Sequence, residues 1–212
     1  MYINTTTLSQ LSESEIRAAF PNTSFGQPFV APVDYALVFP SPQPAHDPLT
    51  QRVQAIAPEL TALGHWEQRW EVVELFDTQT EKDEAIAADR AAKQAAAWER
   101  IKVHRGYLSE NGGYKVSIGG VDKWFHSDAK SKTQQLSLML LGANASAVPP
   151  WKTMDGSKVV MSQALAGQIF AAAVTQDGAL FAAAEAHRAA MEASNTPESY
   201  DFSDGWPTVF VE

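Results

Sequence analysis

The sequence contains no cysteine, which excludes disulfides, thiolate nucleophiles and cysteine-ligated zinc. Basic residues are also few, because 16 Lys and Arg stand against 25 Asp and Glu, a formal charge of −9. Binding to nucleic acid or to an anionic membrane needs clustered positive charge, so we expect neither partner. No apolar run could span a bilayer, and the N-terminal segment MYINTTTLSQ lacks the features of a secretory signal. We therefore expect a soluble protein made in a cytosol.

Motifs for phosphate binding and hydrolysis are missing as well. The sequence has neither glycine-rich nucleotide-binding pattern, and it has no G-x-S-x-G and no H-E-x-x-H. Four of the five histidines lack partners at a spacing that suits a metal or a catalytic base, and these are His46, His65, His104 and His187. We therefore expect no catalytic residue, no metal site and no cofactor.

The stretch His126-Ser127-Asp128 comes nearest to a catalytic pattern. One interpretation makes His126 a base or metal ligand that Asp128 orients. The other has His126 end a strand, Ser127 cap the next helix and Asp128 complement the positive end of that helix. We favour the second interpretation, since it gives Ser127 and Asp128 complete structural roles.

Residues 1–78 are predicted to form a small α/β interaction domain. Ser12 and Glu15 make a capping-box pattern that starts a short helix. A strand is expected at 35–39, ending by Pro40 because proline cannot donate to a sheet. The segment 65–76 alternates, which predicts a strand. One face of that strand would carry Trp66, Trp70 and Val72.

Residues 79–110 are predicted to form a helical connector. Thr78 and Glu81 make a second capping box, and the segment 79–105 holds no glycine or proline. Its packing stripe is small and consists of Ala87, Ala91, Ala95 and Trp98, with Ile86 and Ile101 close by. The helix could be a connecting rod, or it could pack against copies of itself, for example as a trimer.

Residues 111–198 are predicted to form an α-rich domain. Gly119-Gly120 marks a hairpin, and Asp155-Gly156 marks a second one. Between them Ser127 would cap a helix whose inner face holds Leu136, Met139 and Leu140. Ser162 would cap a helix over 163–174, and Asp177 or Gly178 would separate it from a helix over 179–193. Its large anchors would be Leu165, Ile169, Phe170, Leu180 and Phe181.

Residues 199–212 form an aromatic tail around Trp206, Phe210 and Val211. It could anchor a partner, since aromatic residues dominate interface hot spots, or it could fold back on its own core. Aromatic residues elsewhere are further candidates for contact with a partner. The candidate partner-interface residues are Trp66, Trp70, Trp98, Trp206 and Phe210.

Several segments together resemble a known family. They are 123-KWFHSD-128, 151-WKTMDG-156, 162-SQALAGQIFAAAV-174 and 179-ALFAAAEAHRAAMEA-193. The region from Gly113 to Ala193 resembles a C-terminal domain of unknown function in short tailed-phage proteins encoded near tail-fibre genes. Nearer the N-terminus, 2-YINTTTLSQLSESEIRAAFPNTSF-25, 35-YALVFPSPQP-44 and 65-HWEQRWEV-72 resemble the front halves of those proteins. The resemblance implies phage tail biology and no catalytic residues.

We therefore expect an α+β protein with a small N-terminal sheet-containing domain, a long connecting helix and an α-rich C-terminal domain with a β-hairpin. The expected function is a non-enzymatic phage tail protein, in the virion tail, that binds a tail fibre or baseplate protein. The alternative is a tail-fibre assembly chaperone that is absent from the mature virion. A hydrolase of host glycans is a third class, and it would need two facing carboxylates in a cleft.

Overall fold

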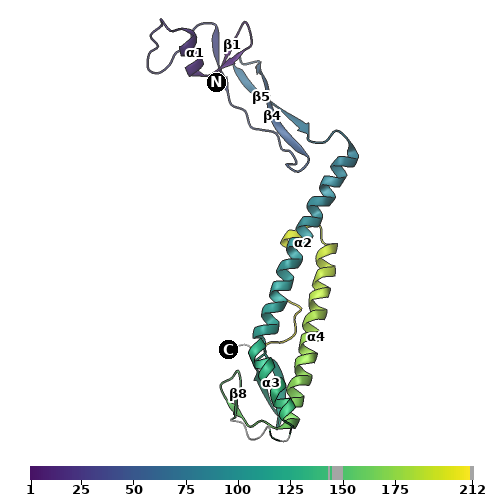
Figure 1. Cartoon of the computed structure of the whole chain (residues 1–212). Helices are drawn as coiled ribbons and strands as arrows, with labels where there is room; N and C mark the ends of the chain where they lie inside the picture. Colours follow the sequence, from purple (N-terminus) through teal and green to yellow (C-terminus); the bar gives the residue numbers. More distant parts are fainter. Residues whose placement is uncertain (143, 145–149, 211–212) are drawn as a thin grey trace. The chain divides into compact units, whose positions relative to one another are not determined.

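The structure is a computed structural model that describes residues 1–142, 144 and 150–210. Helices and strands are mixed along the chain, so the α+β class predicted from the sequence is confirmed (Figure 1). The chain divides into two compact units, Met1–Ala88 and Asp89–Glu212. The long helix α2 (Gln79–Asn111) begins in the first unit and continues into the second.

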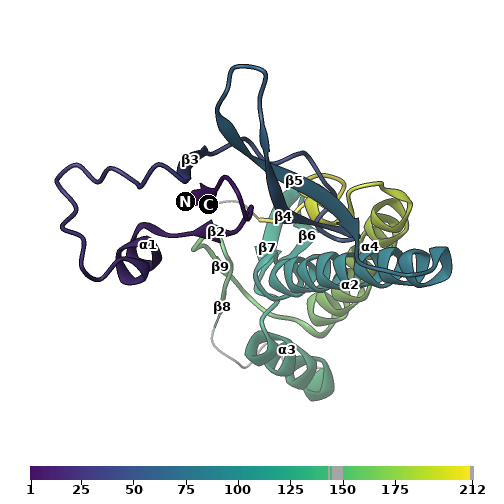
Figure 2. The same cartoon turned by 90° about the horizontal axis from the view of Figure 1, so that it is seen from above.

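A five-stranded sheet forms the first unit. From one edge to the other its strands are β2 (Gln10–Leu11), β1 (Tyr2–Asn4), β3 (Tyr35–Phe39), β5 (Trp66–Glu74) and β4 (Gln51–Leu60). Neighbouring strands are antiparallel except β3 and β5, which are parallel. Figure 2 shows β4 and β5 as a long twisted hairpin. The strands predicted at 35–39 and 65–76 are confirmed, whereas β1, β2 and β4 have no counterpart in the sequence prediction.

The predicted helix starts in and next to this unit are also confirmed. In helix α1 (Glu13–Ala19) the Ser12 hydroxyl accepts from the Glu15 backbone N–H, and the Glu15 carboxylate accepts from the Ser12 N–H. Thr78 and Glu81 make the same reciprocal pair before α2. Both capping boxes satisfy backbone donors that the first turn of a helix leaves free.

The second unit is built on α2 and α4, which run side by side (Figure 1). Its remaining elements are the hairpin β6 (Tyr114–Ile118) and β7 (Val121–Phe125), helix α3 (Ala129–Leu141), the hairpin β8 (Trp151–Lys152) and β9 (Lys158–Val159), helix α4 (Gln163–Ala193) and the 3-10 turn η2 (Pro197–Ser199). Both hairpins turn at the predicted glycines, and Ser162 caps α4 as predicted.

The prediction of two helices over 163–193 is wrong, because α4 is continuous through Asp177 and Gly178. Glycine within a helix costs only about 1 kcal/mol. The Asp177 carboxylate accepts a hydrogen bond from Ser109 on α2 and forms an ion pair with Lys132 on α3. These tertiary contacts hold the helix across the position where a break was expected.

The packing faces of the helices also differ from the prediction. On α2 the predicted Ile101 is buried, together with Ala97 and Leu108, whereas the predicted positions Ala87, Ala91 and Ala95 are exposed. On α3, Leu138 is buried and the predicted Met139 packs against the core, but Leu136 and Leu140 are exposed. On α4, Leu165, Ile169 and Leu180 are buried as predicted, but Phe170 and Phe181 are exposed. On the alanine-rich α2 and α4, short apolar stripes define a helix face poorly, since several faces carry similar apolar content.

Two clusters form the core of the second unit. The first joins β6, β7, α3 and α4 and includes Tyr114, Phe125, Leu138, Met161 and Ile169. The second joins α2 to α4 and to the chain after it and includes Ala97, Ile101, Ala184 and Met191, with Trp98, Tyr200, Phe202 and Trp206 packed around it. The second half of α2 is therefore part of this core as well as a connection between the units.

The start of α3 corrects one predicted role. Asp128, rather than Ser127, is the N-cap, and its carboxylate accepts from the backbone N–H and the hydroxyl of Ser131. Ser127 is buried, and its hydroxyl accepts from the Gly113 N–H at 3.0 Å. Ser127 thus satisfies the backbone where α2 passes into β6.

We expect Ser127→Ala to lower the free energy of unfolding of the second unit by about 1–3 kcal/mol, since it leaves a buried N–H without an acceptor. Urea unfolding followed by circular dichroism would measure the change. Ser137→Ala is the matched control, because its exposed hydroxyl only donates to the Thr133 carbonyl within α3. Equal stability of the two variants would contradict the role of Ser127.

A carboxylate in the turn of the β8–β9 hairpin should make the stability of the second unit depend on pH. The pKa of the Asp155 carboxyl lies well below its usual range because it accepts from Lys123, Thr153 and Ser157. A depressed folded pKa stabilises the fold above the unfolded pKa of about 4, and this contribution disappears as the pH falls further. Asp155→Asn removes this titrating carboxyl. Between roughly pH 5 and pH 2, we therefore expect the urea midpoint of the second unit to fall less in Asp155→Asn than in the wild type. An equally steep fall in both proteins would contradict this role of Asp155.

Candidate functional site

An apolar strip lies along one face of β4 and β5. In this antiparallel pair Val53 lies opposite Val72, Ala55 opposite Trp70 and Leu60 opposite Trp66. Residues directly opposite each other point to the same face of a sheet. The six side chains therefore share one face, and the sequence prediction of Trp66, Trp70 and Val72 on one face is completed by three positions of β4.

The strip is only partly covered by its own unit. Trp70 is half-buried, and its indole N–H donates to the Ser41 carbonyl at 3.1 Å. The Ser41 hydroxyl in turn donates to the Gln68 carbonyl, so the proline-rich segment after β3 lies beside Trp70. Leu60 remains 53% exposed and Val72 36% exposed.

The opposite face of the same hairpin is mainly polar. Gln54 lies opposite Glu71 and donates to its carboxylate at 3.1 Å, and Arg69 forms an ion pair with Glu59. Solvated charges and hydrogen bonds of this kind are typical of a face in contact with water. Because the other face is polar, the apolar strip is the face of this hairpin that a partner would cover.

The buried core of this unit is small. Residues 1–88 are all described, and within them the buried apolar side chains are Ile3, Ile16, Val38 and Pro58. Many large apolar side chains of this unit are instead exposed, and they include Val30, Val33, Leu37, Phe39, Ile56, Leu60, Leu63, Val72 and Leu75. Exposed apolar surface that is contiguous marks interaction sites in soluble proteins.

The other three candidate interface residues belong to the second unit and pack within it. The Trp206 ring lies 5.1 Å from that of His104 and 4.9 Å from that of His187, and its N–H donates to the Phe202 carbonyl at 2.6 Å. The guanidinium of Arg188 lies 5.1 Å from the centre of the Trp98 ring.

Phe210 is held through its backbone, which donates to the Gly112 carbonyl at 2.8 Å, and its ring lies 6.2 Å from that of Trp124. Val211 lies outside the described residues. The described part of the tail thus folds back on its own unit, as one of the two interpretations expected. Contact of these residues with a partner stays a prediction.

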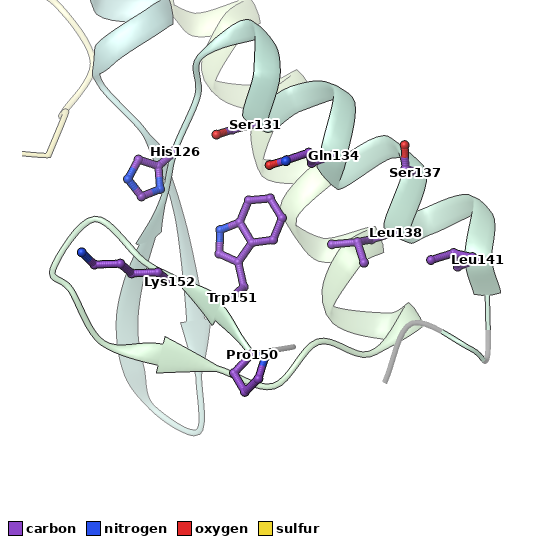
Figure 3. A pocket seen from close by; sticks show the side chains of 9 residues that line it. All are labelled: His126, Ser131, Gln134, Ser137, Leu138, Leu141, Pro150, Trp151 and Lys152. Atoms are coloured by element: carbon purple, nitrogen blue, oxygen red, sulfur yellow. The ribbon is translucent and has the colours of Figure 1, made fainter. Parts of the chain in front are cut away.

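The stretch His126-Ser127-Asp128 does not assemble a catalytic triad. The His126 carbonyl accepts from the Gln135 amide at 2.7 Å, while Ser127 and Asp128 have the backbone roles given above. The His126 side chain instead lines a pocket of about 570 Å³ between α3 and β8, shown in Figure 3. That pocket was not expected from the sequence, because its walls come from separate elements, the end of β7, helix α3 and strand β8.

A polar cluster that sequence reasoning missed joins three helices. The Ser109 hydroxyl donates to Asp177 at 3.0 Å, and the Lys132 ammonium lies 3.3 Å from Asp177 and 3.4 Å from Ser109. Burial alone would lower the pKa of Lys132, but the Tyr114 hydroxyl and Asp177 outweigh it and raise that pKa. A lysine held protonated cannot take a proton from Ser109, so the cluster does not activate a nucleophile. Its geometry ties α2, α3 and α4 together.

Two further searches cover only the described residues. No group of three or more potential metal-ligating side chains comes together among them. No helix in the same residues combines the length and the apolar content needed to cross a membrane.

The fold and its surface define a two-unit α+β protein whose first unit carries an incompletely covered apolar sheet face. The family described as a domain of unknown function (DUF4376) matches residues 77–204, and the chain belongs to this family. The match takes in α2 and most of the second unit but leaves out the five-stranded sheet. No curated protein and no solved structure matches the chain.

Proposed function

We propose that the chain is a non-enzymatic phage tail protein of the virion that attaches to a tail-fibre or baseplate protein through the apolar strip of β4 and β5. The observation that carries the attachment is the partly exposed apolar face of β4 and β5 in a unit whose buried apolar side chains are Ile3, Ile16, Val38 and Pro58. The phage setting rests on the resemblance of the segments quoted from the sequence.

The composition of the strip favours a protein partner. Trp66 and Trp70 share this face with Leu60 and Val72, Gln68 lies between the two tryptophans, and no charged residue is among the six side chains of the strip. Tryptophan is enriched at interface hot spots, and charged residues are depleted at interface centres. The net charge of −9 disfavours a nucleic acid or an anionic membrane as the partner.

Self-association through α2 is a second part of the proposal. Ala91 and Ala95 are exposed, so small side chains leave room for close approach of another helix. A trimer would match the symmetry of a tail fibre. Light scattering on the purified chain is the measurement, and a monomeric mass would remove self-association from the proposal.

Quantitative mass spectrometry of purified virions tests the proposed place of the protein. A stoichiometric copy number would support a structural tail component. Recovery from the infected-cell lysate alone would overturn it in favour of the assembly chaperone. Release of host glycan fragments that depends on a pair of its acidic residues would favour a hydrolase.

The contact surface is tested by two exposed positions of the strip. The double variant Leu60→Lys, Val72→Lys should abolish co-purification of the fibre or baseplate partner, because it places two charges in an apolar contact. Ile56→Lys is the matched control, since Ile56 is similarly exposed but points to the opposite face. Circular dichroism would check that both proteins fold. Partner binding unchanged in the double variant would move the interface elsewhere.

A further inference from the structure

The free edge of strand β4 is an interaction surface distinct from the apolar strip and from α2. We infer that β4 pairs antiparallel with β4 of a second copy of the chain, so that two five-stranded sheets join into one. β4 is the outermost strand of its sheet and has 10 residues, whereas β2 at the other edge has 2 residues. Such a dimer needs no fibre or baseplate partner, and it differs from the trimer that α2 would form.

The backbone of Val53 and Ala55 points away from β5. The Leu75 N–H donates to the Thr50 carbonyl at 2.9 Å, and these two residues continue the register of the β4–β5 pair. Bonded and non-bonded pairs alternate along an antiparallel ladder, so the even-numbered residues of β4 bond to β5 and the odd-numbered ones do not. No other strand pairs with β4, and no hydrogen bond joins the backbone of Val53 or Ala55 to another segment among the described residues. Their N–H and C=O groups therefore face outward.

Most of this edge is unprotected. Sheet edges in natural proteins are commonly blocked by proline, lysine, bulges or very short strands. On β4 such features occur at one end, where Pro58 lies within the irregular pairing between Ile56 and Glu59. The stretch from Gln51 to Ile56 has none of them, and Ala55 is exposed. This stretch is therefore open to pairing with another extended chain.

A second copy of β4 is complementary to this edge when a twofold axis passes through the position of Gln54. Val53 then lies opposite Ala55 of the second copy, and Ala55 lies opposite its Val53. Both residues have outward backbone groups, so each of these pairs can exchange two hydrogen bonds. The Val53 and Ala55 side chains belong to the apolar strip, and residues opposite each other share a face. The strips of the two copies would therefore become continuous.

Charge favours a second copy as the strand that pairs here. Arg52 is exposed on the polar face of β4 and makes no ion pair within residues 1–88, which are all described. In the twofold register it lies opposite Ile56 of the second copy, whose next residue on the polar face is Glu59. Long side chains reach such diagonal neighbours. The Glu59 carboxylate would then lie between Arg52 of one copy and its own partner Arg69, and symmetry repeats this contact.

Sedimentation velocity of the purified full chain tests the pairing, and we expect a dimer. Ala55→Pro should raise the Kd of the dimer about tenfold or more, because symmetry removes two hydrogen bonds at once. An edge strand accepts proline where the N–H position faces solvent, so the pairing of β4 with β5 should persist. Ala55→Ser is the matched control, since it keeps the N–H and should remain a dimer. Circular dichroism would check that both variants fold.

Arg52→Glu tests the same dimer without a change to the backbone. It places a carboxylate next to Glu59 of the second copy and should weaken the dimer about tenfold or more. Folding of the single chain should not suffer, because Arg52 makes no ion pair in its own unit. Arg52→Lys keeps the positive charge and is the matched control.

Amide hydrogen exchange locates the contact on the chain. The Val53 amide should be protected in the wild-type dimer and should lose that protection in Ala55→Pro and in Arg52→Glu. The Gln54 amide faces β5 and should stay protected in all three proteins. A wild type that sediments as a monomer or a trimer, a dimer that neither variant weakens, or a dimer with an unprotected Val53 amide would each overturn the inference.

Discussion

Trp206→Ala is expected to lower the free energy of unfolding of the second unit by about 3 kcal/mol, a large share of the stability of a small domain. The Trp206 ring lies beside His104 on α2 and His187 on α4, and its N–H is bonded to the Phe202 carbonyl. Truncation would remove contacts to both helices at once.

The remaining contacts of the tail point in the same direction. Arg100 on α2 lies over the Phe202 ring, and the Tyr200 hydroxyl lies 3.1 Å from the His187 ring. Pro197 is buried. The tail therefore covers the second core cluster, and deletion of residues 199–212 should destabilise the unit at least as much as Trp206→Ala.

Urea unfolding followed by far-ultraviolet circular dichroism would measure both variants. Val103→Ala is the matched control on α2, because Val103 is 71% exposed, and surface changes of this kind stay within about 0.5 kcal/mol. If the deletion left stability unchanged, the tail would be free to serve as a partner anchor after all, and the packing of Trp206 would be refuted.

Gly113→Ala is expected to cost about 3 kcal/mol, through two separate effects. Gly113 has a φ of +73°, a left-handed conformation that costs a residue with a Cβ roughly 1–2 kcal/mol. A Cβ at this position would lie 2.4 Å from the Met154 sulfur and 3.1 Å from the Phe125 carbonyl oxygen. The Met154 side chain must therefore move, and the Phe125 carbonyl must give way slightly, where α2 passes into β6.

Two other glycines separate these effects. Gly156 has a φ of +79° with open space around it, so Gly156→Ala should show the conformational cost of about 1 kcal/mol alone. Gly178 lies within α4 with nothing near it, so Gly178→Ala should stabilise the unit by about 0.5–1 kcal/mol. Denaturant midpoints of the three variants test this order. A Gly113→Ala protein as stable as Gly156→Ala would show that the close contacts carry no cost.

Local patterns in the sequence were enough for the elements whose signals lie within a few residues. The capping boxes at Ser12 and Thr78, the glycine turns of both hairpins and the alternation before Glu74 all appear in the structure where they were predicted. These features depend on hydrogen bonds and side-chain periodicity that the neighbouring residues supply themselves.

Only part of the candidate sites could be predicted from the sequence. The alternation of Trp66, Trp70 and Val72 predicted one half of the apolar strip. The other half came from β4, whose Pro58 and irregular pairing between Ile56 and Glu59 weaken its strand pattern. The pocket at His126 had no local signal, because Trp151 reaches it from a different hairpin.

By itself, then, the sequence determined the α+β class, the long helix α2, the turns and the exclusion of cysteine chemistry. Only the tertiary structure decided which faces of α2 and α3 are buried, that α4 runs unbroken through Gly178, and that Trp206 packs between two histidines. The physical reason on α2 and α4 is that alanine-rich helices carry similar apolar content on several faces. Contacts between residues distant in the chain, such as Asp177 with Ser109 and Lys132, then select one arrangement.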